Sequence, residues 1–157
     1  MCALTERFMG TIPNPKVVDA DGGKPLDVLG DTIIRKVGPE DSGGAFAVYK
    51  EVSPPGGGAP LHVHEQTDEI FYVLEGEYEV TCGQRTFTAK AGTYAVLPRG
   101  KPHAFTNLAD TPSSLLITIM PGGYFRFFEE VDAASESGPL DDESLATIAQ
   151  RHDIRVL

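Results

Sequence analysis

The sequence has few of the residues that define disulfide-bonded, zinc-thiolate or membrane-spanning proteins. Its 157 residues include two cysteines and no tryptophan. Cys2 and Cys82 stand far apart and no CxxC spacing occurs, so neither a disulfide framework nor a thiolate zinc site is expected. No apolar stretch approaches the roughly 18 residues that span a bilayer. Residues 1–7 have no apolar segment of the secretory type, and we therefore expect a cytoplasmic protein.

Positive charge is also scarce. The 13 Lys and Arg residues stand against 23 Asp and Glu residues, which gives a formal net charge of −10. A surface of this sign repels phosphate backbones and anionic lipid headgroups. We therefore expect neither a nucleic-acid partner nor a membrane partner.

Turn-forming residues are plentiful, and they separate short apolar segments. The chain has 17 Gly and 12 Pro, and segments of this length with β-branched and aromatic residues are typical of strands. Gly83-Gln84 suits a tight hairpin turn. The pattern predicts an all-β sandwich or barrel in a single domain, with an arm over 1–26, a barrel over 27–121 and a helical tail over 122–157. Strands are expected at 33–37, 45–52, 61–64, 69–74, 77–82, 85–89, 94–97, 104–107 and 115–120.

Helical spacing of apolar residues occurs only in the tail. It runs over 124–131 and again over 145–152, and the second stretch follows acids that favour a helix N-terminus. We expect one or two short helices packed on the outside of the barrel. Phe125, Phe127 and Phe128 are interpreted as helix packing. The glycine-rich segment 53–60 is expected to be a loop without a phosphate site, because no Lys-Ser or Lys-Thr follows it.

Histidine is rare, yet three of the four histidines fall close to one acid. His62 and His64 are two residues apart, so in a strand both rings point to the same face. Glu69 begins an apolar strand, and His103 follows a proline- and glycine-containing turn. Three imidazoles and one carboxylate suit a single divalent transition metal: Fe, Ni, Co, Mn, Cu or Zn. Four ligands leave positions open for a substrate, whereas His152 is expected to be a helix-end residue with no catalytic role.

The spacing around these four residues resembles the two motifs of the cupin superfamily. The first, G-x5-H-x-H-x4-E-x6-G, runs from Gly56 to Gly76, and the second, G-x5-P-x-G-x2-H-x3-N, runs from Gly92 to Asn107. The resemblance implies a cupin double-stranded β-helix, or jelly-roll, barrel. It also implies that the metal ligands are His62, His64, Glu69 and His103.

Three further segments resemble the bacterial quercetinase-like single-domain cupins. They are residues 54–64, 71–76 and 121–130. This resemblance implies a metal-dependent dioxygenase that uses dioxygen to open a flavonol- or enol-type aromatic ring. Glu69 would then be both a ligand and the base that accepts the substrate's hydroxyl proton. Inward-facing residues suit a flat, apolar small molecule, and the candidate pocket residues are Tyr49, Phe71, Val73 and Phe105.

Two other functions stay open on the sequence. One is a decarboxylase or isomerase acting on a small acid or sugar, which needs cationic groups above the metal. The other is a non-catalytic module that binds a small ligand. The cationic candidates lie in turns or on an outward face: Lys50, Arg85, Lys90, Arg99 and Lys101.

Cupin barrels commonly pair through an N-terminal edge strand. The segment 33–37 and the arm before it would suit that role. The resemblance therefore implies a homodimer.

Overall fold

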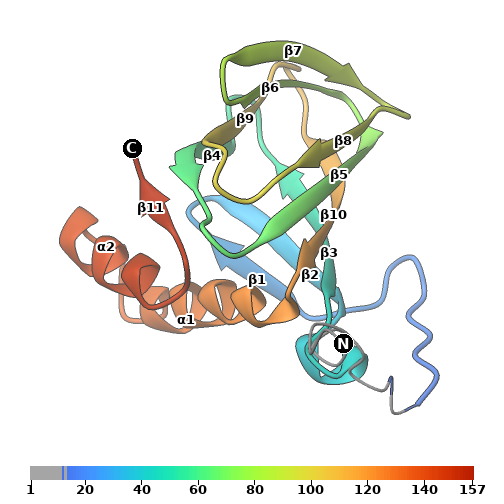
Figure 1. Cartoon of the computed structure of the whole chain (residues 1–157), viewed down its shortest axis with the longest axis vertical. Helices are drawn as coiled ribbons and strands as arrows, with labels where there is room; N and C mark the ends of the chain where they lie inside the picture. Colours follow the sequence, from blue (N-terminus) through green and yellow to red (C-terminus); the bar gives the residue numbers. More distant parts are fainter. Residues whose placement is uncertain (1–11, 13) are drawn as a thin grey trace, which may run out of the picture.

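A computed structural model describes residue 12 and residues 14–157, so Cys2 lies outside the described residues. Two antiparallel sheets face each other (Figure 1). One has the order β1-β2-β3-β10-β5-β8 and the other β11-β4-β9-β6-β7. This arrangement confirms the all-β jelly-roll class. The strands are β1 (Pro25–Val28), β2 (Asp31–Val37), β3 (Ala47–Ser53), β4 (Gly58–Val63), β5 (Asp68–Glu75), β6 (Glu77–Cys82), β7 (Arg85–Lys90), β8 (Tyr94–Leu97), β9 (His103–Asn107), β10 (Ser113–Met120) and β11 (Arg155–Val156).

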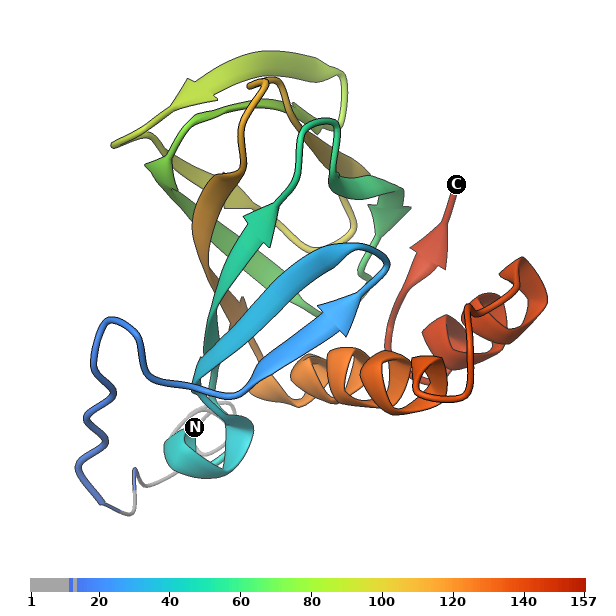
Figure 2. The same cartoon turned by 180° about the vertical axis from the view of Figure 1, so that it is seen from behind.

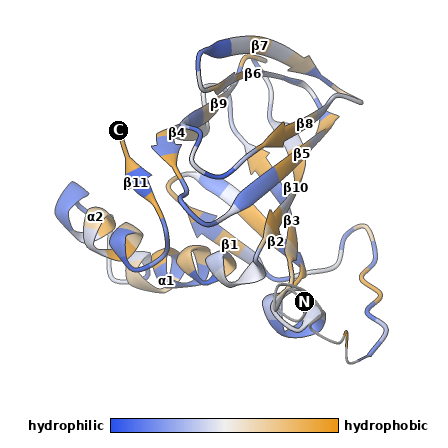
Figure 3. Cartoon of the chain, viewed as in Figure 1, coloured by the Kyte–Doolittle hydropathy of each residue, from blue (hydrophilic) through white to orange (hydrophobic). Residues whose placement is uncertain are grey.

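The period of two in the sequence decides which side chains fill the space between the sheets. In β3, Ala47, Tyr49 and Glu51 are buried and alternate with half-buried neighbours. β10 runs through the middle of its sheet and is largely hydrophobic (Figure 3). The inward row of β3 therefore places one acid, Glu51, among apolar side chains.

The β6–β7 hairpin follows the sequence prediction closely. Cys82 pairs with Arg85 across the Gly83-Gln84 turn. Gly83 has a φ of 60°, a left-handed conformation that glycine adopts without a steric penalty. The predicted turn is confirmed.

The structure corrects the predicted strands at both ends of the chain. β1 was not predicted, so the barrel starts at Pro25, inside the expected arm. Because β1 pairs with β2, segment 33–37 is not an edge strand, and the proposed dimer edge belongs to β1 instead. The homodimer itself stays a prediction. β11 was also missed, and β4 begins at Gly58, within the segment expected to be a loop.

The tail forms the two predicted helices, but they do more than cover the outside. A 3-10 turn (Gly122–Phe125) leads into α1 (Arg126–Ser135), and α2 (Asp142–Gln150) is capped by Asp141, whose carboxylate accepts from the Ser144 amide at 2.8 Å. α1 contacts β1, and the chain returns through β11 to pair with β4 (Figures 1 and 2). Neither described helix has the length and apolar character needed to cross a membrane.

Candidate metal centre

Strands from both sheets bring the four predicted ligands to one point. His62 lies on β4 and His64 just after it; Glu69 lies on β5 in the opposite sheet, and His103 begins β9. His62 pairs directly with His103 across the β4–β9 ladder. One ligand atom from each of the four residues lies within 4.8 Å of the others, and all four residues are buried.

The three imidazoles are held in one orientation by the backbone. Each Nδ1 lies at hydrogen-bonding distance from a carbonyl oxygen, which can only accept, so each Nδ1 carries the hydrogen. The Nε2 lone pairs then face the centre of the quartet. The carbonyl oxygens are those of Pro60, 2.7 Å from His62, Asp153, 2.7 Å from His64, and Lys101, 3.0 Å from His103.

This arrangement leaves electron-rich atoms facing each other. Nε2 of His103 lies 3.2 Å from Glu69 Oε2, and Nε2 of His64 lies 3.5 Å from Glu69 Oε1. In the described part of the chain, the buried His64 Nε2 has no hydrogen-bond partner. A positive centre between these atoms removes the conflict, and a three-imidazole, one-carboxylate donor set is suited to a divalent transition metal. The residues therefore fit a metal ion.

Two members of the quartet, Glu69 and His62, have pKa values shifted in the direction that suits metal binding. Burial would raise the pKa of Glu69, but the adjacent His103 and His64 side chains outweigh it and hold that pKa well below its ordinary value. Burial lowers the pKa of His62 to about 4. An ionised carboxylate and a neutral imidazole are the forms that bind a metal.

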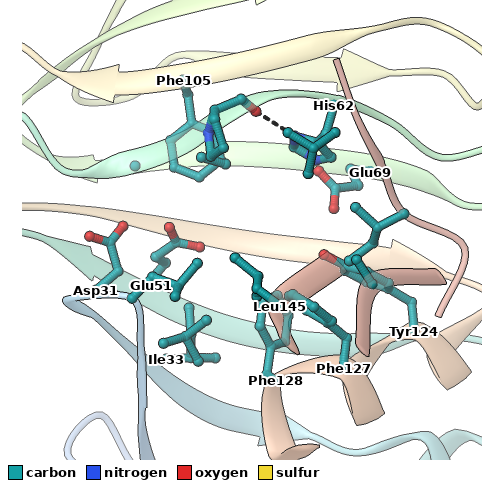
Figure 4. A pocket seen from close by; sticks show the side chains of 18 of the residues that line it. Asp31, Ile33, Glu51, His62, Glu69, Phe105, Tyr124, Phe127, Phe128 and Leu145 are labelled. Atoms are coloured by element: carbon teal, nitrogen blue, oxygen red, sulfur yellow. Dashed lines mark hydrogen bonds between the residues drawn. The ribbon is translucent and has the colours of Figure 1, made fainter. Parts of the chain in front are cut away.

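A pocket opens beside the quartet, and His62 and Glu69 form part of its wall (Figure 4). Of the four predicted pocket residues, Tyr49 and Phe105 line it. Phe71 and Val73 are not among its lining residues. They are buried in the core, where the Phe71 ring packs edge-to-face on Phe105 at 5.0 Å.

Comparison with known proteins agrees with this geometry. The sequence profile of the cupin domain family matches residues 49–120, which carry all four residues of the quartet. The barrel is a cupin domain.

Several relatives and solved structures share parts of this cupin chain. A germin-like protein (subfamily 2 member 2) of Arabidopsis thaliana is 43% identical over 67 residues, which are 40% of this chain and 31% of that protein. Quercetin 2,3-dioxygenase of Bacillus subtilis is 34% identical over 64 residues, 41% of this chain and 19% of that enzyme. The chain thus spans less than a third of either relative. A Thermotoga maritima structure described as a predicted oxalate decarboxylase superposes with a TM-score of 0.62 at 24% identity, covering 67% of this chain and 98% of that one, which supports the fold.

Asn107, the last residue of the second cupin motif, has a structural role. Its buried amide donates to the carbonyl oxygens of Ser53 and Pro54 at 3.0 and 3.1 Å and to that of Thr111 at 2.9 Å. It therefore holds the loop before β4 rather than the metal site. Nearby, the Gly100 amide donates to the His64 carbonyl at 2.7 Å, which ties the second motif to the first.

The tail of this cupin reaches the metal centre through Asp153. Besides the backbone contact to His64, its carboxylate accepts from the amides of Glu65 and Gln66 at 3.0 and 2.9 Å and from the Thr67 hydroxyl at 2.9 Å. Asp153 has a φ of 60°, which Asp tolerates better than most residues. Sequence reasoning missed it, because no local pattern relates position 153 to position 64.

Aromatic residues of the tail also line the pocket. Tyr124, Phe127 and Phe128 line it, in addition to packing on one another. The interpretation of the phenylalanine cluster as packing was therefore incomplete. Phe128 meets Tyr49 edge-to-face at 4.9 Å, which joins helix and barrel. His152, in contrast, contacts Glu130 at 2.5 Å and does not line the pocket.

Two acids of the pocket wall, Asp31 and Glu51, were also missed. Their side chains are neighbours, and the residues are only 6% and 5% exposed. The Ser53 hydroxyl donates to Asp31 at 2.8 Å. Burial, and then the adjacent Asp31 carboxyl, hold the pKa of Glu51 well above its ordinary value. Glu51 therefore keeps its proton at pH values where an exposed glutamate loses it.

We expect Glu51→Gln to stabilise the protein at neutral and alkaline pH. The unfolded chain releases the Glu51 proton above its ordinary pKa and the folded chain retains it, so wild-type stability falls as pH rises through that window. Gln has no proton to lose. Urea unfolding at several pH values between 4 and 8 should give a free-energy difference that favours the variant and grows with pH. A difference that is flat or shrinks with pH would contradict the protonated state of Glu51.

Proposed function

We propose that the metal-loaded protein is a dioxygenase that opens an enol- or flavonol-type ring. The observation that carries this proposal is the juxtaposition of two features. Three oriented imidazoles and one carboxylate converge at the wall of a pocket that is otherwise mostly apolar and aromatic. The relationship to quercetin 2,3-dioxygenase over the shared segment supports the same reaction class.

The chain's own residues would position the substrate and receive its proton. A bound divalent transition metal supplies the Lewis acidity and redox chemistry that reaction with dioxygen requires. Glu69 is the base for the substrate hydroxyl. Its depressed pKa makes it a weak base, so the transfer depends on a hydroxyl acidified by the metal. Tyr49, Phe105 and Phe128 hold a flat ring and exclude water.

The size of the pocket narrows the substrate class. Its volume is about 100 Å³, which is room for roughly three water molecules at about 30 Å³ each. A ligand of one or two rings matches that space better than a three-ring flavonol. Within the proposed function, we therefore favour a small enol-type aromatic substrate.

The pocket's charge separates this function from the alternatives. Among the described residues that line it there is no Lys or Arg. Arg99, a cationic candidate within the second motif, is paired with Asp68 at 2.6 Å. A small carboxylate or phosphate would thus lack a cationic partner. A non-catalytic role fits less well with a pocket that reaches His62 and Glu69.

Oxygen uptake tests the proposal. Protein loaded separately with Fe(II), Ni(II), Co(II) and Mn(II) is mixed with quercetin, 3-hydroxychromone and oxalate under an oxygen electrode. We expect metal-dependent oxygen consumption with the chromone, at least as fast as with quercetin, and none with oxalate. Full metal occupancy without oxygen consumption on either ring substrate would reject the dioxygenase.

A further inference from the structure

The pocket has a second polar end, remote from the metal centre. Figure 4 shows Asp31 and Glu51 on one side of the pocket and His62 and Glu69 on the other. The register of the sheet explains the separation. Glu69 pairs with Ile119 on β10, which pairs with Ala47 on β3, and Glu51 lies four residues further along β3. At about 3.3 Å per residue, that is roughly 13 Å along the strand.

One of the two acids is fixed by the protein and the other is not. Asp31 Oδ2 accepts from the Ser53 hydroxyl at 2.8 Å, and its Oδ1 lies against the backbone of Gly57, where a Cβ would come within 2.6 Å of it. Glu51, in contrast, has no hydrogen-bond donor among the described residues, although it is 95% buried and lines the pocket. Its carboxyl is hydrogen-bonded to the adjacent Asp31 carboxyl. The remaining oxygen lone pairs of Glu51 accept no hydrogen bond from the described residues, and a ligand that donates to them would offset part of the cost of burying this carboxyl.

We propose that Asp31 and Glu51 bind a hydroxyl group of the substrate at the end of the molecule remote from the metal. Two buried carboxyls in contact cannot both ionise readily, so the pair shares one proton. The shared proton lies between the two carboxyls, and the remaining oxygen lone pairs of the pair accept the hydrogen of a substrate hydroxyl group. The apolar walls between the two ends, including Ile33 and Phe128, fit a flat ring. The substrate class is thus an enol-type aromatic molecule with a second hydroxyl at its far end.

This inference rests on the proposed function for the metal-binding end of the ligand, and its test is one of binding rather than turnover. Zinc-loaded protein, which has no redox chemistry, is titrated under nitrogen with three fluorescent probes. They are 3-hydroxychromone, 3,7-dihydroxychromone and 3-hydroxy-7-methoxychromone. We expect wild type to bind the 7-hydroxy probe about five- to tenfold more tightly than the other two, the value of one neutral hydrogen bond.

Variants at Glu51 assign that preference to the carboxyl pair. Glu51→Leu should abolish it, whereas Glu51→Gln, which keeps a neutral donor and acceptor, should retain most of it. Thermal unfolding checks each variant's fold, and Glu51→Met replaces Glu51→Leu if the latter shows no transition. Glu79→Gln, at an exposed position on β6, is the matched control and should behave as wild type.

The outcomes separate this inference from the proposed function. Equal binding of the three probes by wild type, no binding of any, or a preference that survives the apolar replacement would overturn the role of the pair. Oxygen consumption could still occur in each case. Conversely, a preference that depends on Glu51, in a protein that consumes no oxygen, would support the pair and reject the dioxygenase.

Discussion

The His103→Ala variant is expected to lose its metal and all measurable oxygen consumption. Substituting an outer-shell partner of a metal ligand costs about 10–100-fold in metal affinity, and removing a ligand should cost more than 100-fold. The reason is visible in the geometry. His103 Nε2 lies 3.2 Å from Glu69 and its ring is 4.4 Å from that of His62, so its loss opens one side of the quartet.

Two measurements check this result. Element analysis of purified protein gives metal per chain, and competition with a chromophoric chelator gives the affinity. His152→Ala is the matched control, because His152 bonds to Glu130 and lies outside the quartet. It should keep wild-type metal content. Metal content that is unchanged in His103→Ala would show that the quartet is not the metal site.

The parts of this protein that could be predicted from sequence are those encoded by short spacings. The i, i+2 relation of His62 and His64 fixes a shared face in any strand. The glycine and proline positions around them set turns that only a few conformations satisfy. Family spacing then added Glu69 and His103. These spacings, combined with a single strand topology, bring the four ligand residues together. The quartet could therefore be predicted from the sequence, and its residues meet in the structure.

The rest depends on pairings between distant segments. β1 has four residues and β11 has two, and such short strands are too brief for a distinct periodic signal. Glu51 lies two residues after Tyr49, so its side chain also points inward. It was not predicted to line the pocket, because the sequence does not show where along the strand the pocket lies. Phe71 points to the same face of its strand as Glu69 but packs in the core. The alternation of side chains predicts the face of a strand, but it does not predict which residues along that face meet the pocket. Pocket residues from the tail are likewise set by how α1 packs on the barrel.

Asp153 is the residue through which the tail should control both stability and the metal. Its carboxylate accepts three hydrogen bonds from the segment after β4, and its carbonyl oxygen orients His64. We expect Asp153→Ala to lower the free energy of unfolding by about 2–4 kcal/mol, since charge-assisted bonds are lost and alanine is disfavoured at positive φ. Metal affinity should fall about tenfold or more, because His64 loses its fixed orientation.

Two variants separate the carboxylate from its surroundings. Asp153→Asn keeps a residue that tolerates the left-handed conformation and one acceptor oxygen, so it should fall between wild type and Asp153→Ala. Arg155→Ala removes only an exposed ion pair to Glu65, and should change the free energy of unfolding by less than about 0.5 kcal/mol. Urea unfolding of the metal-free proteins isolates the stability effect, and chelator competition measures the metal. If Asp153→Ala loses stability but binds metal as wild type does, the tail stabilises the barrel without orienting His64. If the variant keeps both its stability and its metal affinity, the contacts around Asp153 do not hold the tail in place.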